Sequence, residues 1–325
     1  MKNTETISVA MCTFNGGLYL QEQLRSIASQ IRQPDELIVC DDGSSDNTIK
    51  IIEEYATQVS FTVRLFKNEV NLCPTKNFEK AISLCSGNII LLSDQDDVWY
   101  SDKLSVIAET FRNNPMSGAV FSNAEVVDSH LKSLGYDLWQ SINFTRCQQH
   151  CFARGKAVAI LLKHNVVTGA TLAFRQQYKK VVLPIPNNWI HDEWIALIIA
   201  AVSDLTYIKK PLVKYRQHQK NQIGAVRKNL NKQFISARNK RSDYYLSAYN
   251  RIYDMRNRLL QECSISIKKK ILLKIDAKLK HLAKRANMSQ RLWLRLPSVL
   301  SEFIAYRYHR YSNGVKSFAK DLFLS

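Results

Sequence analysis

The sequence predicts an α/β protein with a mixed, mainly parallel sheet flanked by helices, followed by a basic, mainly helical C-terminal region. Short apolar runs alternate with segments of helical periodicity through the first third of the chain, which is typical of parallel βαβ units. Positive charge is concentrated near the end. Residues 1–225 contain 23 Lys and Arg against 22 Asp and Glu, whereas residues 226–325 contain 23 against 6. We therefore expect two regions, 1–225 and 226–325.

The predicted strands and helices alternate from the N-terminus onward. The apolar run from 7 to 12 predicts a first strand, and Leu20, Leu24 and Ile27 repeat with helical spacing after it. The same reasoning predicts further strands at 36–40, 61–66 and 88–92 and helices at about 19–30, 47–57 and 75–85. Beyond them, residues 119–121 suggest another strand. Residues 166–174 are strand-like around Gly169, where glycine indicates a close backbone approach.

Three of these strands end in polar or acidic turns. The turns comprise residues 13–15, 41–46 and 94–97. Because parallel strands joined by right-handed crossovers bring their carboxyl ends to one edge of the sheet, we expect the three turns to line one cleft. The competing interpretation is that they only form loops, which would suffice for Gly43-Ser44-Ser45.

The most informative turn contains three carboxylates, those of Asp94, Asp96 and Asp97, directly after an apolar strand. Like charges in such proximity repel one another, and a hard divalent ion that bridges to a substrate phosphate is the usual compensation. The alternative is a solvated acidic turn before the next helix, with Asp102 as the helix cap.

A second acidic pair, Asp192 and Glu193, lies between Trp189 and Trp194 at the start of an apolar helix. Loss of solvation raises the pKa of a carboxylate toward the range useful for a general base. The sequence equally allows Asp192 to be a helix N-cap.

A basic segment, residues 214–221, precedes the change in composition and contains Arg216 and His218. Its cations and amides are suited to charge-assisted hydrogen bonds with phosphates, and His218 is a candidate metal ligand. A solvated basic turn is the alternative.

The C-terminal region is basic and amphipathic. Residues 266–288 carry apolar side chains at three- and four-residue spacing opposite a face of lysines, and residues 291–311 are rich in aromatic side chains. This pattern favours contact with an anionic membrane surface, although a helix that packs internally would look alike. No nucleic-acid-binding motif accompanies the charge, so a nucleic-acid partner is not expected.

The remaining composition is that of a globular protein, with 46% hydrophobic and 23% charged residues. Seven cysteines without a C-x-x-C pair indicate a reducing compartment. We find no secretory signal and no run of ~20 apolar residues, so we expect a cytoplasmic protein that does not span the membrane.

Taken together, these motifs resemble family 2 glycosyltransferases of the GT-A fold, a Rossmann-like α/β architecture, over roughly residues 7–222. The resemblance rests on Thr13-Phe14-Asn15, on residues 41–46, on Ser93-Asp94-Gln95-Asp96-Asp97-Val98-Trp99 and on His191-Asp192-Glu193-Trp194. Two segments are similar to sequences of the bacterial rhamnosyltransferase-like branch of this family: Asp-Gln-Asp-Asp-Val-Trp and Tyr215-Arg216-Gln217-His218. This similarity points toward a function in the assembly of O-antigen, capsule or related polysaccharides.

The resemblance implies a role for each matched position. Residues 1–225 would form the catalytic domain, with Thr13, Phe14, Asn15, Asp42, Asp94, Asp96 and Arg216 as nucleotide-sugar-binding residues. Phe14 would stack on the nucleobase, Asp42 would accept a hydrogen bond from its N–H, and Asp96 would contact the ribose. Mn²⁺ or Mg²⁺ would be held by Asp96, Asp97 and His218. Asp192 would be the catalytic base, with Glu193 as a neighbour able to share that role.

The implied activity is metal-dependent, inverting transfer of a sugar from a nucleotide donor to a hydroxyl of a cell-surface glycan or lipid-linked precursor. The favoured donor is dTDP-L-rhamnose. The enzyme would be peripheral at the inner face of the cell membrane, bound through residues 226–325. The alternative is a non-catalytic sugar-nucleotide-binding subunit of a polysaccharide assembly complex.

Overall fold

The computed structural model of the 325-residue chain describes residues 5–218, 241–262 and 269–323. It divides into two compact units, each considered by itself below. The first comprises Met1–Gly155 and Val166–Val226, and the second comprises Lys156–Asn165 and Arg227–Ser325.

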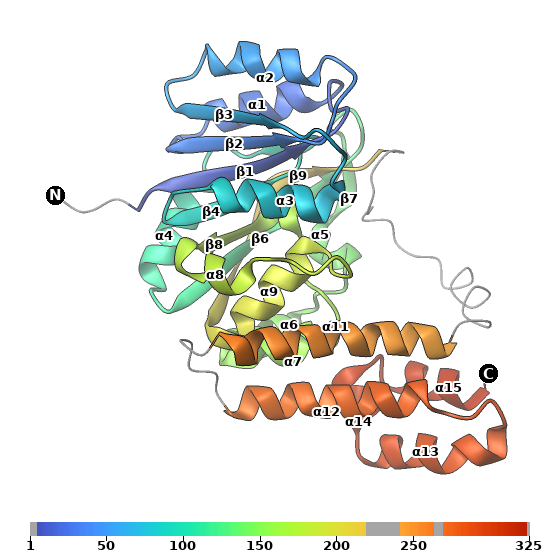
Figure 1. The fold of residues 1–325 in the computed structure, drawn as a ribbon. Coiled ribbons are helices and arrows are strands. Elements are labelled where there is room, and N and C mark those ends of the chain that lie inside the picture. The colour runs from blue at the N-terminus through green and yellow to red at the C-terminus, as the bar shows by residue number, and fades with distance from the viewer. Residues whose placement is uncertain (1–4, 219–240, 263–268, 324–325) are drawn as a thin grey trace. The chain divides into compact units, whose positions relative to one another are not determined.

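The first unit alternates strands and helices from its N-terminus (Figure 1). Its strands are β1 (Ile7–Thr13), β2 (Glu36–Asp41), β3 (Thr62–Lys67), β4 (Ile89–Ser93), β5 (Val98–Trp99), β6 (Ser117–Val127), β7 (Ser133–Asp137), β8 (Leu172–Arg175) and β9 (Asp204–Arg216). Its helices are α1 (Leu20–Ala28), α2 (Thr48–Ala56), α3 (Cys73–Leu84), α4 (Lys103–Asn113), α5 (Leu138–Ser141), α6 (Arg146–Cys151), α8 (Lys179–Val182) and α9 (His191–Val202).

The strands form one mixed sheet in the order β3-β2-β1-β4-β8-β6-β9-β5, with β7 paired to β6. Strands β1 to β4 are parallel, and the register sets Thr13 beside Asp41 and Met11 beside Ser93. Strand β8 runs antiparallel to β4 and β6, and β5 runs antiparallel to β9. The predicted mixed, mainly parallel α/β architecture is confirmed, and the ends of β1, β2 and β4 lie at the same edge.

Strand β9 and the segment 166–174 differ from the expectation in ways that bear on the site. Strand β9 has 13 residues, yet the sequence analysis described its last part only as a basic segment. The segment 166–174 is divided between a 3₁₀ turn, η2 (Gly169–Thr171), and the start of β8. The register of β9 against β6 shifts near Pro211, because proline cannot donate a ladder hydrogen bond.

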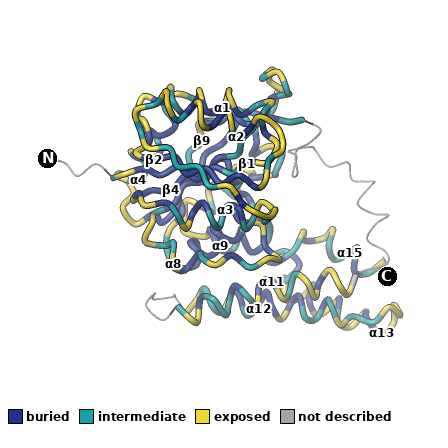
Figure 2. The backbone as a smooth tube through the Cα atoms, turned by 45° about the horizontal axis from the view of Figure 1, so that its top comes forward, coloured by how far each residue is buried: buried dark blue, intermediate teal, exposed yellow. Residues whose placement is uncertain are grey.

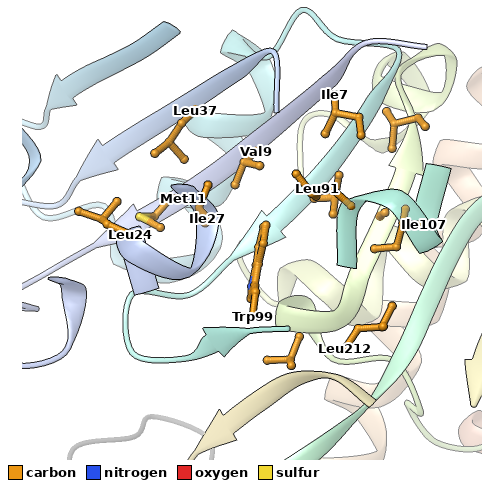
Figure 3. Close-up of a cluster of buried hydrophobic side chains, with 14 of the residues drawn as sticks. Ile7, Val9, Met11, Leu24, Ile27, Leu37, Leu91, Trp99, Ile107 and Leu212 are labelled. Carbon is orange, nitrogen blue, oxygen red and sulfur yellow. The ribbon is translucent and has the colours of Figure 1, made fainter. Parts of the chain in front are cut away.

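The central strands are buried on both faces, as the burial-coloured view shows (Figure 2). Successive side chains of a strand point to opposite sides, so each strand supplies two cores. On one side, Val9, Leu91 and Trp99 pack with Ile27 of α1 and Ile107 of α4 (Figure 3). Helix α3 contacts β1, β2 and α9 within the same unit. This double burial explains the near-continuous apolar strand sequences.

The second unit contains α7 (Ala157–Leu161), α11 (Arg241–Gln261), α12 (Lys269–Ala286), α13 (Leu292–Ile304), α14 (Arg307–Tyr311) and α15 (Val315–Phe323). Helix α12 contains most of the predicted amphipathic segment, and Ile267 of that pattern lies outside the described residues. Its Ile275, Leu279 and Leu282 are buried, and α12 packs against α11. The apolar side of α12 is therefore used for packing within the unit, which was the alternative to membrane contact.

Charged side chains form part of the interior of the second unit. Asp321 accepts hydrogen bonds from Arg285 and Tyr308, and all three are buried. Glu302 accepts a hydrogen bond from Arg307 and lies 2.7 Å from Nδ1 of His281. Burial of unpaired charge is costly, so these partners are required for the acids to sit inside. Across the described ranges, none of the helices combines the length and apolarity needed to cross a membrane.

Candidate active site

The end of β1 is fixed by bonds to two neighbouring loops. The Thr13 hydroxyl donates to Asp41, at 2.7 Å, and is buried. Asn15 adopts a positive φ of 46°, and its side-chain oxygen accepts a hydrogen bond from the Ser45 backbone N–H. Phe14 stands between these two residues with 45% of its surface exposed. Among the three predicted residues of this turn, Phe14 and Asn15 are exposed and Thr13 is buried, and Phe14 supplies the exposed aromatic ring.

Gln95, in the acidic turn after β4, clamps the backbone of Phe14. Its Oε1 accepts a hydrogen bond from the Phe14 N–H at 2.9 Å, and its Nε2 donates to the Phe14 carbonyl at 3.0 Å. The turns after β1 and β4 are thereby joined. The sequence alone gives Gln95 no separate function, because an amide between carboxylates has no distinctive signature.

Asp42 lies at the end of β2 and is buried. Its Oδ1 accepts hydrogen bonds from Asn68 Nδ2, at 2.8 Å, and from the Leu72 N–H, at 2.7 Å. Its own N–H donates to the Thr13 carbonyl at 2.8 Å. The loop between β3 and α3 therefore orients the Asp42 carboxylate.

The carboxylates after β4 perturb one another. Burial and the charges of Asp96 and Asp192 raise the pKa of Asp94 to about 7. Burial and the charges of Asp96 and Asp94 raise the pKa of Asp97 well above its usual value. The hydrogen bond that Asp97 accepts from the Arg216 N–H lowers this pKa but does not cancel the increase. Asp97 Oδ2 is buried and has no hydrogen-bond partner among the described residues. An orphaned buried carboxylate oxygen is the kind of group that a cation satisfies.

His218 lies against the same turn. Its Nε2 is 2.8 Å from Oδ2 of Asp96, and its ring stacks on Tyr19 with 4.8 Å between centroids. The predicted pair of Asp96 and His218 is thus adjacent in the structure. Residues 219–221 of the predicted basic segment lie outside the described residues.

Arg216 has a different environment from the expected one. Its side chain is buried, donates to the Asp96 carbonyl at 2.6 Å and to the Ser129 carbonyl at 2.6 Å, and pairs with Glu22. A direct contact with a diphosphate would require these bonds to break. This environment favours a positioning function, in which Arg216 supports the backbone of the acidic turn, and the predicted phosphate contact stays a prediction.

Asp192 lies in the first turn of α9, whose N-cap is Ile190. The alternative that Asp192 is the N-cap is therefore wrong. Its Oδ2 accepts a hydrogen bond from the Gly169 N–H at 2.9 Å, which links α9 to η2. A Cβ on Gly169 would lie 2.9 Å from Nε2 of His191, so the close approach expected at this glycine is observed. Asp192 and Trp194 are two positions apart on α9, so their side chains point in different directions. The indole N–H of Trp194 donates a hydrogen bond to the Val182 carbonyl.

Two further residues, Tyr215 and Lys103, belong to the site, and the sequence patterns assign neither of them a function. Burial raises the pKa of Tyr215 well above its usual value, and the charges of Asp97, Asp94, Asp96 and Asp192 add to this increase. Lys103 of α4 is 1% exposed, with Nζ 3.7 Å from the centroid of the Trp99 ring and 2.7 Å from the Ala170 carbonyl. Burial lowers the pKa of Lys103 to about 7, against the charges of Asp97 and Asp94.

These electrostatic relationships describe which predicted residues come together. Burial raises the pKa of both Tyr215 and the Cys12 thiol, and the charges of Asp94, Asp96, Asp97 and Asp192 add to the shift of Tyr215, while those of Asp94 and Asp42 add to that of Cys12. Carboxylate oxygens and an imidazole nitrogen suit Mn²⁺, and carboxylates suit Mg²⁺. No group of three or more His, Cys, Asp or Glu side chains within residues 5–218, 241–262 and 269–323 is arranged to hold an ion by itself.

The architecture is that of the GT-A glycosyltransferases. TarS residues 1–349 from S. aureus, solved with UDP-GlcNAc, superpose with a TM-score of 0.57 at 17% identity, over 98% of this chain and 81% of that one. The mannosyltransferase PcManGT from Pyrobaculum calidifontis, solved with GDP-Man and Mn²⁺, gives a TM-score of 0.52 at 15% identity, over 98% and 80%. At these identities the likeness establishes the fold.

Sequence comparison identifies the family. Residues 8–177, more than half of the chain, match the model of glycosyl transferase family 2, and the chain belongs to this family of enzymes. The dTDP-rhamnosyl transferase RfbG of Shigella flexneri is 29% identical over 240 residues, which cover 66% of this chain and 74% of that protein. The glucosyltransferase WfgD of Escherichia coli, named for UDP-Glc and a diphosphoundecaprenol-linked GlcNAc, is 26% identical over 45% of this chain and 56% of its own length.

Proposed function

We propose that the chain is a metal-dependent, inverting glycosyltransferase that transfers a sugar from a nucleotide donor to a hydroxyl of a cell-surface glycan or lipid-linked precursor. The observation that carries the proposal is the acidic turn after β4, where Oδ2 of Asp97 is buried with no hydrogen-bond partner among the described residues and Oδ2 of Asp96 lies 2.8 Å from Nε2 of His218. Carboxylates this close raise one another's pKa, and a divalent cation offsets their repulsion.

The favoured donor is dTDP-L-rhamnose. Similarity to RfbG over two thirds of the chain supports this sugar, and the rhamnosyltransferase-like motif around Asp96 agrees with it. The lipid-linked acceptor in the name of WfgD supports an acceptor of that class. Because WfgD is named for a different donor, UDP-glucose is the main competitor to test.

Each residue then has a physical function in donor binding. The exposed ring of Phe14 stacks on the nucleobase, and Asp42, oriented by Asn68 and Leu72, accepts a hydrogen bond from the base. Asp96 contacts the ribose, and Asp94 adds negative charge to the cluster. Thr13, Asn15 and Arg216 hold the surrounding turns through the bonds described above.

No three of these side chains are arranged as a ready ligand set in the described residues, so Asp97, Asp96 and His218 would hold Mn²⁺ or Mg²⁺ only together with the donor, and the bound ion would supply positive charge for the departing nucleoside diphosphate. The fit rests on the unsatisfied Oδ2 of Asp97 and on the adjacency of Asp96 and His218. We propose that diphosphate oxygens of the donor complete the ligand set.

Asp192 is the proposed base. Its carboxylate takes the proton of the acceptor hydroxyl while the hydroxyl oxygen attacks the anomeric carbon from the face opposite the diphosphate. One C–O bond forms as the C–O bond to the diphosphate breaks, so the anomeric configuration inverts. The Gly169 N–H orients the carboxylate in this step, and general-base assistance contributes roughly 10²–10⁴ in rate. Glu193 is the competing assignment.

We further propose that residues 1–225 carry the catalytic activity and that residues 226–325 bind an anionic membrane surface. The enzyme would then be cytoplasmic and peripheral at the inner face of the cell membrane. The charge of the C-terminal region supports this proposal, because basic segments near an anionic leaflet are attracted to it.

The test is nucleotide release by the purified chain with a panel of nucleotide sugars, including dTDP-L-rhamnose and UDP-glucose, with Mn²⁺, Mg²⁺ or a chelator. We expect release from dTDP-L-rhamnose that depends on the divalent ion and is lost in Asp97→Ala. The matched control is Asp204→Ala, which removes an exposed carboxylate at the opposite end of β9. Normal turnover by Asp97→Ala, or full activity in chelator, would contradict metal dependence.

A further inference from the structure

Helix α13 has an unusual distribution of side chains for a helix in water. Its exposed positions include Leu292, Leu296, Leu300 and Ile304, which are spaced by four residues and therefore form one stripe. Trp293 lies beside this stripe with 68% of its surface exposed, and Ile304 is 82% exposed. Figure 2 shows exposed positions along α13.

The opposite side of α13 buries two charged residues, Arg295 and Glu302, together with Val299. Arg295 donates to the carbonyls of Gln290 and Leu322 and is buried. Glu302 is fully buried and is bonded to His281 and Arg307. An ordinary surface helix turns its apolar stripe to the core and its charges to solvent, whereas α13 buries Arg295 and Glu302 and leaves most of its large apolar side chains exposed.

The charge of the surrounding surface determines which partner suits this stripe. Two of the six acidic residues of 226–325, Glu302 and Asp321, are buried and paired with cations. Arg291, Arg310 and Lys316 are exposed in and next to the C-terminal helices. An apolar stripe that includes a tryptophan and is accompanied by cations is the arrangement of helices that lie in the interface of an anionic bilayer. A second copy of the chain would bring two strongly cationic surfaces together, so charge complementarity favours the lipid.

The structure assigns the membrane contact to α13: its stripe of Leu292, Trp293, Leu296, Leu300 and Ile304 inserts among the acyl chains of an anionic leaflet while neighbouring cations contact the headgroups. This inference deepens the membrane contact of the proposed function and rests on it. It also changes the expected element, since the apolar side of α12 is occupied by internal packing.

Trp293 provides a direct readout of insertion. The chain has five tryptophans, and Trp99, Trp139, Trp189 and Trp194 are all buried. With the full-length chain and vesicles of phosphatidylglycerol and phosphatidylcholine, we expect a blue shift of tryptophan emission and quenching by lipids brominated on their acyl chains. Vesicles of phosphatidylcholine alone should give neither. Sedimentation with anionic vesicles that produces no blue shift and no quenching would overturn insertion, because the contact would then be electrostatic only.

The matched variants change residues that already face solvent. Trp293→Gln with Ile304→Gln should reduce partitioning onto anionic vesicles at least tenfold. Ile31→Gln with Met116→Gln, which removes equally exposed apolar side chains from the first unit, should leave partitioning unchanged. Retained binding by the α13 variant would refute the assignment. So would concentration-dependent dimerisation without lipid that the α13 variant abolishes, since a second copy would then cover the stripe.

Activity separates this inference from the proposed function. Without vesicles, the α13 variant should release nucleotide from a soluble donor at the wild-type rate. Loss of vesicle binding with intact release supports the α13 contact alone. Absence of release from every donor, with vesicle binding intact, would contradict the proposed catalysis and leave the membrane contact standing.

Discussion

The ammonium group of Lys103 donates a hydrogen bond to the backbone carbonyl of Ala170, with 2.7 Å between Nζ and the oxygen. Ala170 directly follows Gly169, whose N–H binds the Asp192 carboxylate. The same ammonium group lowers the pKa of Asp94 and Asp97 through its charge. One buried cation therefore links the carboxylate turn after β4 with the turn that holds the proposed base.

We expect Lys103→Met to weaken metal activation. Without the cation, the pKa values of Asp94 and Asp97 rise further, and a carboxylate must be deprotonated to bind a metal ion. The Mn²⁺ concentration for half-maximal nucleotide release should increase by about tenfold or more, which corresponds to about 1.4 kcal/mol. The acid limb of the pH–rate profile should move to higher pH.

Lys210→Met is the matched control, because Lys210 is exposed and pairs with Asp102 at the surface. It should change neither the Mn²⁺ requirement nor the pH profile, since surface ion pairs contribute little. Equal effects of the two substitutions would remove Lys103 from the site.

Asp192→Asn should stop sugar transfer while donor binding is retained. Asparagine preserves an oxygen that can accept the Gly169 hydrogen bond but cannot take a proton at neutral pH. We expect transfer to fall by roughly 10²–10⁴ with the donor Kd, measured by calorimetry, within a factor of two or three. Glu193→Gln, measured in parallel, should retain most activity, and the reverse pattern would transfer the role to Glu193.

His191 should make the stability of the first unit depend on pH. Burial lowers the pKa of its imidazole to about 3, and the ring stacks on Phe78. The unfolded chain takes up a proton near pH 6.5 that the folded chain rejects, so the stability is present above pH 6.5 and is lost as the pH falls toward 3. Between pH 8 and pH 5 this loss is about 2 kcal/mol.

His191→Phe should reduce the pH dependence of the unfolding free energy by that amount. Urea titrations at pH 8 and pH 5 of both proteins measure the difference, which is insensitive to groups that the two proteins share. If the unfolding free energies of the wild type and His191→Phe changed equally with pH, His191 would be accessible to protons in the folded chain.

Gly169→Ala should displace the turn that orients Asp192. The added Cβ would lie 2.9 Å from Nε2 of the His191 ring, which is too close for van der Waals contact. We expect transfer to fall about tenfold and the thermal midpoint to decrease, with overpacking typically costing 1–3 kcal/mol. Gly169→Ala should reduce stability and transfer by less when it is combined with His191→Asn. If the effects of the two substitutions were strictly additive, the clash with His191 would be excluded as the cause.

The strands and the acidic turns were predictable because they depend on local patterns. Apolar runs such as 88–92 report burial on both faces of a parallel sheet, and the topology alone brings the ends of β1, β2 and β4 to one edge. Strand β9 was missed because Lys209, Lys210 and Pro211 interrupt its pattern, and its place between β6 and β5 is a tertiary property.

The residues that were missed or misassigned are those whose function depends on burial. A lysine in a helix is ordinarily solvated, so nothing local distinguishes Lys103 from Lys210. Arg216 carries the expected charge, yet its donors are used inside the protein by the Asp96 and Ser129 carbonyls. The sequence correctly predicted that α12 is amphipathic. Whether its apolar side contacts a membrane or packs against other helices depends on the tertiary structure, which buries that side within the second unit.

The Gln95 clamp on the Phe14 backbone has a consequence for the energetics of donor recognition. The amide occupies the N–H and C=O of Phe14 as a neighbouring strand would, so this backbone is held before any ligand arrives. Ordering a loop on binding costs conformational entropy, and a ring mounted on a preorganised backbone avoids that cost. We then expect the affinity for the nucleotide to depend mainly on a slow dissociation rate. Gln95→Ala should increase the dissociation rate constant of the nucleotide more than it decreases the association rate constant. Stopped-flow measurements determine both constants.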